Sequence, residues 1–476
     1  MINFRTERDM LGEMEVPVGA YWGIHTQRAM KNFAVSAFRV PGEMITALAE
    51  VKEACALANM RAGLLDKGTG EAIVAAAKEV ASGALADQFV VDAFQGGAGT
   101  STNMNMNEVL ANRAIEVLGG QKGDYRLVNP LDHVNLSQST NDVYPTALKV
   151  AAVRLVITLS ENIARLQGSF QDKEKEFAGI LKLGRTEMRD AVPIMLGQEF
   201  GAYAEAFARD RWRLFKAEER LRQVNLGGTA VGTGLNAHRE YIAYAIEELQ
   251  SITGLGIARA ENMIDITQNA DVFAEVSALV KAASVNLAKI SADLRLLSMG
   301  PGGGLAEIRL PVRQEGSSIM PDKANPVISE MASSVAFQVM SLDHAVTLAA
   351  SSGQLELNAF MPLIAFNLLT ALKIMVNAVS IFRTELVDGI TADEGRCRQW
   401  LEESLCLATA LAPYVGHEAA SEISRTARAE GKTIGEVAAE KGYFSPEEIG
   451  SIFASRELTR PGIAGSKKVK RQEKEK

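Results

Sequence analysis

Apolar residues recur at three- and four-residue steps over residues 272–297, and this spacing constrains the fold more than any other feature of the chain. The series consists of Val272, Val276, Leu279, Val280, Ala283, Leu287, Ile290, Leu294 and Leu297. Because such steps place side chains on one face of an α-helix, the pattern predicts one helix of more than 25 residues, which is long for a globular protein. Similar patterns cover residues 151–177, 198–223, 328–350 and 361–387. Several long helices with short connections predict an all-α fold built around a long-helix bundle.

Shorter elements flank the predicted bundle on both sides in the sequence. We expect residues 1–139 to form a mostly helical N-terminal domain, residues 140–395 the central helical bundle, and residues 396–466 a small C-terminal helical domain. Glycines and prolines mark the turns of this last domain. Residues 467–476 are rich in charge and are expected to form a disordered tail.

Charge and cysteine usage exclude several classes of protein. A formal net charge of −8 argues against general nucleic-acid binding, and it means that an anionic substrate needs positive charge placed locally. The three cysteines, Cys55, Cys397 and Cys406, do not have the spacing of a metal site and indicate a reducing compartment, so we expect a cytoplasmic protein. The five histidines form no metal-ligand pair at helical spacing, and we expect neither a metal nor a cofactor.

The most apolar stretch, residues 357–382, is not expected to cross a membrane. Pro362, Asn367, Lys373 and Asn377 interrupt it. A helix that is apolar on nearly every face is instead typical of a large core or of an oligomer, and this is a first indication of assembly. The charged N-terminus has no apolar signal-peptide core.

Two polar segments in the first third of the chain combine hydrogen-bonding groups. Residues 95–105 carry three glycines that let backbone N–H groups approach a ligand closely, and Thr100 adds a hydroxyl. A helix N-cap explains this segment equally well, and the two roles are compatible because helix N-termini attract carboxylates. Residues 132–142 place Ser139, Thr140 and Asn141 in succession, although alone these would form an ordinary cap.

Two further polar segments lie later in the chain. Residues 184–191 hold Thr186 and Glu187 and lead into a predicted helix. Residues 316–326, Gly-Ser-Ser-Ile-Met-Pro-Asp-Lys-Ala-Asn-Pro, bring two hydroxyls, a lysine and an amide together. This set suits a mobile loop that closes over an anionic substrate and brings a hydroxyl to a C–H bond. A Gly/Thr-rich segment at 227–236 supports the site; a nucleotide-binding fingerprint is a weak alternative there, because no strand precedes it.

The loop at 316–325 resembles the signature loop of the aspartase/fumarase superfamily, with Ile319 as the one residue between Ser318 and Met320. The other three polar segments also match that superfamily, and the resemblance spans about residues 3–466. It implies an all-α fold of three domains, with the central bundle forming a multi-helix core in a homotetramer. The implied partners are a small dicarboxylate or amino-acid substrate and further copies of the chain, which share active sites between subunits.

Two short segments favour the aspartase branch of this superfamily over the fumarase branch. Residues 95–101, Gln-Gly-Gly-Ala-Gly-Thr-Ser, look like the aspartase form, and so does His25 before Thr26. The implied reaction is the reversible anti elimination of ammonia from L-aspartate to give fumarate. A class II fumarase, a lyase that acts on an N-substituted aspartate, and a non-catalytic relative are the alternatives.

The resemblance also implies roles for individual residues. Ser317 is the expected general base, and backbone donors on the loop together with Lys323 would lower its pKa. The expected ligands of the α-carboxylate are Lys323, Asn325 and Thr186. Asn141 is expected to bind the amino group. Four hydroxyl groups suit the charge that develops on the β-carboxylate: those of Thr100, Ser139, Thr140 and Ser318.

The sequence departs from the family pattern at three positions. Glu187 stands where relatives carry histidine or glutamine, and the family's histidine pairs with a glutamate that matches Glu330. We expect Glu187 to contact the substrate ammonium or to accept a proton; the alternative is that it turns towards Arg185 or Arg189. Asp322 stands where a small residue is usual and Ala324 replaces a common valine, so the substrate is less certain than the reaction type.

Overall fold

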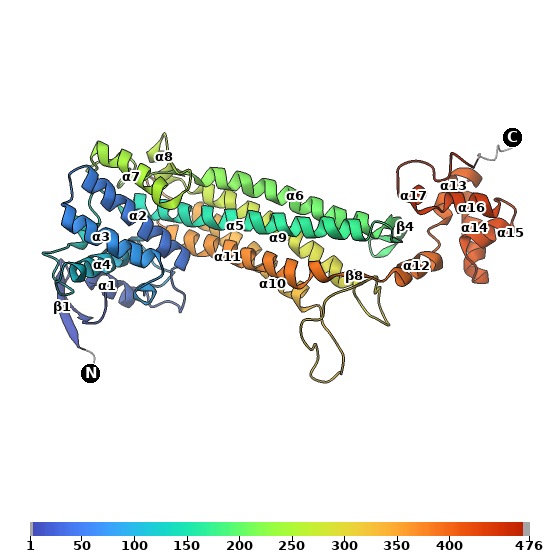
Figure 1. The fold of residues 1–476 in the computed structure, drawn as a ribbon, viewed down its shortest axis with the longest axis horizontal. Coiled ribbons are helices and arrows are strands. Elements are labelled where there is room, and N and C mark those ends of the chain that lie inside the picture. The colour runs from blue at the N-terminus through green and yellow to red at the C-terminus, as the bar shows by residue number, and fades with distance from the viewer. Residues whose placement is uncertain (1–2, 470–476) are drawn as a thin grey trace. The chain divides into compact units, whose positions relative to one another are not determined.

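Long α-helices dominate the fold, as the apolar spacing predicts. The computed structural model describes residues 3–469. Each predicted long pattern corresponds to one helix, and the pattern at 272–297 matches its helix to within one residue. These helices, which Figure 1 shows as the longest ribbons, are α5 (Thr140–Glu176), α6 (Leu196–Leu221), α9 (Asp271–Leu297), α10 (Val327–Ala350) and α11 (Met361–Glu385). The all-α fold class is therefore confirmed.

Helix α5 begins at Thr140, eleven residues before the position that the apolar pattern indicates. Pro145 lies within this extension and has no N–H to donate to the carbonyl of Asn141, four residues earlier. The Asn225 side chain supplies the missing donor, because its Nδ2 lies 3.0 Å from the Asn141 oxygen. A tertiary contact therefore compensates for a residue that local propensity alone would place outside a helix.

The described chain divides into two compact units, each assembled from three separate segments. The first unit contains residues up to 162, residues 210–285 and residues 334–378. The second contains residues 163–209, 286–333 and the chain from 379 onwards. Each of the five long helices contributes one part to each unit. The predicted division into 1–139, 140–395 and 396–466 remains a prediction about the order of elements along the chain.

Shorter helices make up the rest of the first unit, together with parts of the five long ones. Helix α2 packs against long helices through ion pairs, with Glu50 bound to Arg154 of α5 at 2.6 Å and Glu43 bound to Lys373 of α11 at 2.6 Å. The short elements are α1 (Ile24–Asn32), α2 (Gly42–Arg61), α3 (Lys67–Ala81), η1 (Ala86–Gln88), α4 (Thr100–Val117), η2 (Pro130–Val134), α7 (Arg239–Thr253) and α8 (Met263–Gln268).

The strands of the described chain form four small two-stranded sheets. In the first unit β1 (Phe4–Asp9) pairs antiparallel with β2 (Gly12–Pro17), and β5 (Gln223–Val224) pairs parallel with β6 (Ala258–Arg259). The expectation that no strand precedes the segment 227–236 was therefore wrong, because the two-residue strand β5 lies just before it. In the second unit β3 (Leu181–Thr186) pairs antiparallel with β4 (Arg189–Met195), and β7 (Ile308–Arg309) pairs antiparallel with β8 (Thr391–Ala392).

The long helices of the second unit pack through aromatic side chains. Phe170 of α5 stacks on Phe207 of α6 with ring centroids 5.7 Å apart, and Tyr203 of α6 donates a hydrogen bond to Asp293 of α9 at 3.0 Å. The remaining elements of this unit are η3 (Val387–Gly389), α12 (Glu394–Glu403), α13 (Ala408–Val415), α14 (His417–Glu430), α15 (Ile434–Glu440), α16 (Pro446–Ile452) and α17 (Ser455–Leu458).

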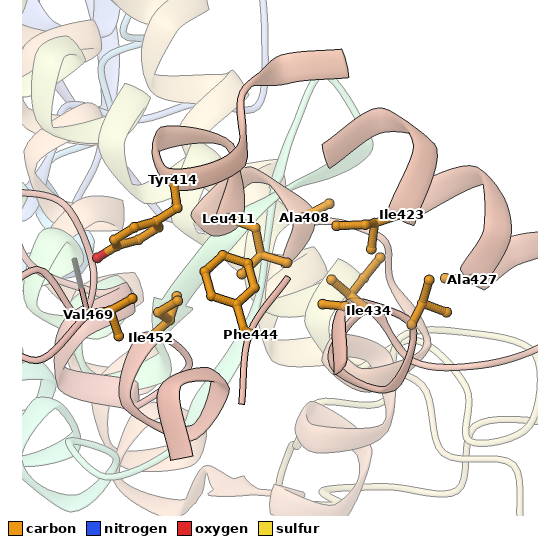
Figure 2. Close-up of a cluster of buried hydrophobic side chains, with 11 residues drawn as sticks. Ala408, Leu411, Tyr414, Ile423, Ala427, Ile434, Phe444, Ile452 and Val469 are labelled. Atoms are coloured by element: carbon orange, nitrogen blue, oxygen red, sulfur yellow. The ribbon is translucent and has the colours of Figure 1, made fainter. Parts of the chain in front are cut away.

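A separate apolar cluster holds the C-terminal helices together (Figure 2). Leu411, Ile423, Ile434 and Ile452 are fully or almost fully buried in it, and Val469 joins them with 4% of its surface exposed. Capping boxes at Thr433 and Ser445 begin α15 and α16. Of the predicted tail 467–476, Val469 packs in this cluster, Lys467 and Lys468 are exposed, and residues 470–476 lie outside the described part of the chain.

Two of the long helices have the length and composition of membrane spans, but most of their apolar surface is covered. In Thr140–Glu176, 78% of the most apolar window is buried inside the protein, and in Met361–Gly389 the fraction is 56%. The apolar stretch noted at 357–382 belongs to the second of these. Burial of this kind is what the core helices of a globular protein show.

Candidate active site

The first polar segment turns directly into helix α4, with Thr100 as its first residue. Gly97, Ala98 and Gly99 all have positive φ, at 84°, 56° and 96°. A Cβ on Gly99 would lie 2.4 Å from the Tyr144 ring, so only glycine fits against that side chain. Gly99 is the N-cap residue of α4, and no side chain caps this end of the helix. The exposed Thr100 therefore lies at a helix N-terminus, which favours an anion.

The second segment forms the first turn of helix α5. Thr140 is almost buried, with 8% of its surface exposed, and the two neighbouring residues are half-buried. Asn141 donates from Nδ2 to the carbonyl of Ala230 at 2.7 Å, which leaves its Oδ1 as the acceptor for a ligand. The Ser139 hydroxyl oxygen accepts the N–H of Asn141 at 3.2 Å.

Asp142 joins this turn to the Gly/Thr-rich segment 227–236. Its carboxylate accepts three backbone N–H groups, those of Ser139 at 3.0 Å, Gly227 at 3.1 Å and Thr229 at 3.1 Å. Burial raises the pKa of this carboxyl to about 6, although the three backbone donors act in the opposite direction. Asp142 is the last residue of the polar segment 132–142. Its anchoring role depends on hydrogen bonds to residues more than 80 positions further along the chain, which the sequence does not reveal.

In the second unit, strands β3 and β4 form the hairpin that carries Thr186 and Glu187. Glu187 and Met188 occupy the two central turn positions with φ of 52° and 61°, as a tight hairpin turn requires. Both side chains, and that of Thr186, are exposed. The turn therefore presents Glu187 away from the hairpin core.

An ion-pair network anchors the base of this hairpin. Glu307 is completely buried and binds Lys182 and Arg185, each at 2.8 Å. Lys182, 2% exposed, also binds Glu199 at 2.9 Å. Paired buried charges of this kind are costly to disrupt, because removal of one partner leaves the other unpaired. Arg185, next to Thr186, is thus held by Glu307.

Glu187 has no ion pair with Arg185 or Arg189 among the described residues, so the alternative in which it turns towards those arginines is not what the structure shows. It lines a cavity of about 700 Å³ together with Asp190, Lys289 and Trp400. Glu330 lies at the start of α10, where it contacts Arg295 at 3.6 Å and lines a different cavity of the same unit.

The loop at 316–326 holds the Ser317 hydroxyl between backbone donors. Its Oγ accepts hydrogen bonds from the N–H groups of Ile319 at 3.1 Å and Met320 at 2.9 Å. Donors directed at an oxygen stabilise its anionic form and lower its pKa. Such donors would favour the ionised hydroxyl that the predicted base role of Ser317 requires.

The two ends of the loop are tied together. Gly316 donates its N–H to the carbonyl of Lys323 at 2.8 Å, and Asn325 donates from Nδ2 to the carbonyl of Gly316 at 2.6 Å. A Cβ at Gly316 would lie 2.6 Å from both the Asn325 nitrogen and the Lys323 oxygen, so a side chain has no room. Asp322 has φ of 60°, a left-handed conformation that glycine, asparagine and aspartate tolerate better than other residues.

A cavity of about 1050 Å³ lies beside this loop and is lined by Lys323 and Asn325. Arg295, Arg309 and Arg396 add positive charge to its wall, and Asp322, Glu330 and Asp393 add negative charge. Two of these arginines are paired within the wall, Arg309 with Asp393 at 2.8 Å and Arg295 with Glu330 at 3.6 Å. No group of three metal-ligating side chains occurs among the described residues.

The structure thus sorts the predicted site residues into two sets. The first unit holds Thr100, Ser139, Thr140 and Asn141, and the second holds Thr186, Glu187, Ser317, Ser318, Lys323 and Asn325. Sequence reasoning missed the buried Asn103 and Asn107 beneath the first set. The available signal was the recurrence of asparagine at alternate positions from 103 to 107 in a buried helix.

Comparison with known proteins places the chain in a family. A family model described as Lyase matches residues 12–341, and one described as Fumarase C C-terminus matches residues 407–460. An aspartate ammonia-lyase from Bacillus sp is 47% identical over 97% of this chain and 99% of its own length. An aspartate ammonia-lyase from Escherichia coli (strain K12) is 42% identical over 96% of this chain and 97% of its own length.

Solved structures agree with this placement. A fumarate lyase:delta crystallin from Brucella melitensis, bound to cobalt, superposes with a TM-score of 0.92 and 46% identity, covering 96% of this chain and 100% of its own. A class II fumarase from Schistosoma mansoni gives a TM-score of 0.92 and 32% identity over 96% of this chain and 99% of its own. Fold and matches together define an enzyme of the lyase class. The chain belongs to the aspartase/fumarase superfamily.

Proposed function

We propose that this enzyme is an aspartate ammonia-lyase that converts L-aspartate reversibly to fumarate and ammonia. The single observation that carries the proposal is the Ser317 hydroxyl, which accepts two backbone hydrogen bonds on the Gly-Ser-Ser loop. Relatives named aspartate ammonia-lyase match almost the whole chain at 42–47% identity, which supports the choice of substrate. The segment with Gly97, Ala98 and Gly99 supports the same branch of the family.

The chemical difficulty is the proton beside the β-carboxylate, which is very weakly acidic. In the proposed mechanism the ionised Ser317 takes this proton. The electron pair of the broken C–H bond is delocalised into the β-carboxylate, which becomes a dianionic aci-carboxylate. Expulsion of ammonia then breaks the C–N bond and forms the carbon–carbon double bond. Donors preorganised for the transient charge are the usual means of lowering such a barrier, and the hydroxyls of Thr100, Ser139, Thr140 and Ser318 are assigned to this task.

The rest of the substrate is assigned to amide, ammonium and hydroxyl groups. Lys323, Asn325 and Thr186 bind the α-carboxylate, and the position of Lys323 and Asn325 on the wall of the cavity beside the loop supports this placement. Asn141 accepts a hydrogen bond from the substrate ammonium through Oδ1, since its Nδ2 is engaged by Ala230. Glu187 also contacts the ammonium or accepts a proton from it; its exposed position on the hairpin turn supports a role towards a ligand.

We further propose that the chain acts as a homotetramer whose active sites draw residues from more than one subunit. Exposed apolar side chains on long helices support assembly. Phe337 is 60% exposed and Leu348 is 55% exposed, and their spacing of eleven residues on α10 places them on one face. Other copies of the chain would remove such surface from water. A monomer with full activity would contradict shared sites.

A cytoplasmic location is part of this proposal. Its support is the state of the cysteines: Cys55 and Cys397 are buried and free, and Cys406 is free and half-buried. Free thiols of this kind suit a reducing compartment.

The test is fumarate production, followed by ultraviolet absorbance, with L-aspartate and with L-malate as separate substrates. Turnover of aspartate alone is the expected result. Turnover of malate alone would identify a class II fumarase, an outcome that the 0.92 TM-score to the Schistosoma mansoni enzyme makes worth testing. Activity with an N-substituted aspartate alone would show that this compound is the substrate, with the same type of elimination reaction.

A further inference from the structure

A buried polar cluster lies directly beneath the first turn of α5. Asn103 and Asn107 lie on α4, four residues apart, with 2% and 0% of their surfaces exposed. Both donate from Nδ2 to the side-chain oxygen of Asn135, at 3.1 Å and 3.0 Å. Asn103 alone also donates to the hydroxyl oxygen of Thr140, at 3.1 Å.

Lys52 determines the direction of these hydrogen bonds. Its side chain is fully buried and donates to Asn135 Oδ1 at 3.0 Å and to Gln138 Oε1 at 2.8 Å. Because the ammonium and the amine can both donate here, Asn135 must present its oxygen towards Lys52. Asn103 must then present its NH₂ to that same oxygen, since a flipped amide would bring two carbonyl oxygens together.

The orientation of the Asn103 amide determines whether the Thr140 hydroxyl donates or accepts its next hydrogen bond. A hydroxyl has one proton and two lone pairs, and Asn103 occupies a lone pair. Thr140 is the first residue of α5, so no carbonyl of a preceding helical turn is available to accept its proton. Among the described residues the Thr140 proton has no acceptor, so it is available to a ligand.

We propose that Asn103 is a positioning residue that holds the Thr140 hydroxyl as a hydrogen-bond donor to the substrate carboxylate on which charge develops. This inference rests on the proposed function and deepens it. Asn103 does not touch the substrate; it acts through Thr140. The buried and unpartnered Asn103 Oδ1 is consistent with an amide whose orientation is set by its two donor contacts.

The decisive variant is Asn103→Asp, because a carboxylate is nearly isosteric but accepts hydrogen bonds and would draw the Thr140 proton away from the ligand. Asn107→Asp is the matched control: it makes the same change one turn along α4, with the same Asn135 partner and without the Thr140 contact. We expect Asn103→Asp to lose about 100-fold in kcat/KM, mostly in kcat, as removal of a transition-state donor does. Asn107→Asp should lose less than about tenfold.

A double-mutant cycle with Thr140→Val separates positioning from general damage. If Asn103 acts through the Thr140 hydroxyl, Asn103→Asp should change kcat/KM by less than about threefold in the Thr140→Val background, because coupled residues are not additive. Equal losses in the two aspartate variants, or an undiminished Asn103→Asp effect without the hydroxyl, would overturn the proposal. If Asn103→Asp does not fold, Asn103→Leu with Asn107→Leu as control applies the same comparison without charge.

The experiment also distinguishes failure of the inference from failure of the proposed function. Wild-type turnover of L-aspartate tests the function. The ratio between the 103 and 107 variants tests the positioning role, and it can be measured with L-malate if that is the substrate that wild type uses. Absence of wild-type activity with L-aspartate, L-malate and N-substituted aspartates alike would overturn both proposals.

Discussion

The hydroxyl oxygen of Ser317 lies 2.9 Å from the backbone nitrogen of Met320, three residues further along the same loop. Ile319 supplies a second backbone donor to this oxygen, so the loop itself provides part of the stabilisation that a serine base needs. Side chains placed on other elements are not required for these two contacts. These two hydrogen bonds therefore depend on the backbone conformation of the loop.

Replacement of Ser317 by alanine should reduce kcat by roughly 1000-fold, within the range that a general base contributes. The loop keeps its closing contacts between Gly316, Lys323 and Asn325, which do not involve the serine side chain. The thermal unfolding midpoint should therefore remain close to that of wild type. Activity equal to wild type in the Ser317→Ala enzyme would exclude the proposed base.

Replacement of Gly316 by alanine should reduce activity through the shape of the loop. The added Cβ would lie 2.6 Å from backbone atoms at both Lys323 and Asn325, so the two ends of the loop must separate. Gly303→Ala is a suitable control, because a Cβ there meets nothing within 4 Å. We expect a loss of at least about tenfold in kcat for Gly316→Ala and near-wild-type kinetics for the control. Similar kinetics for both variants would contradict this account.

Replacement of Glu187 by glutamine should weaken binding of the substrate ammonium. A hydrogen bond to a charged group contributes about 1.5–3 kcal/mol, so KM for L-aspartate should rise roughly tenfold or more. Asp190→Asn changes another carboxylate beside the same cavity and should leave KM nearly unchanged. Unchanged kinetics in the Glu187→Gln enzyme would show that this carboxylate has no part in binding or proton transfer.

The buried Lys52 predicts a specific pH dependence of stability. Burial lowers its pKa from 10.5 to about 7, and the neighbouring Cys55 and Asp142 act in the opposite direction. Between those two values the unfolded chain binds more protons than the folded chain, so this group makes the free energy of unfolding rise with pH. The slope is at most about 1.4 kcal/mol per pH unit.

Thermal unfolding of wild type and Lys52→Met at pH 7 and at pH 9 checks this prediction. From pH 7 to pH 9 the thermal unfolding midpoint of wild type should rise relative to that of Lys52→Met. The control Lys67→Met, at an exposed position, should show the same pH dependence as wild type. Parallel curves for wild type and Lys52→Met would mean that Lys52 titrates as an ordinary lysine in the folded protein.

Replacement of Asp142 by asparagine should destabilise the first unit and its binding segments together. One side of the new amide would present N–H groups to backbone donors, leaving buried groups unpaired at a cost of about 1–3 kcal/mol. The exposed Asp132 offers the control Asp132→Asn. Chemical denaturation measures the difference, and equal stability of the two variants would contradict an anchoring role for Asp142.

The sequence was most informative where periodicity and local geometry decide the outcome. Apolar spacing located α9 to within one residue, since one face of that helix is buried along its whole length. It missed the first turns of α5, because Pro145 is tolerated there only through the contact from Asn225. The polar segments were found as motifs, but the donors on Ser317 depend on the bend of the loop, which residue identity alone does not specify.

What the sequence by itself determined is the set of long helices, the all-α class and the polar segments that carry chemical groups, because each depends on residues close together in the chain. The tertiary structure alone decided how those groups are directed. Asn103 and Thr140 are 37 residues apart, and Asp142 reaches backbone groups at 227 and 229. A hydrogen bond has a donor and an acceptor at a fixed distance, so its direction is set only when both partners have been brought together.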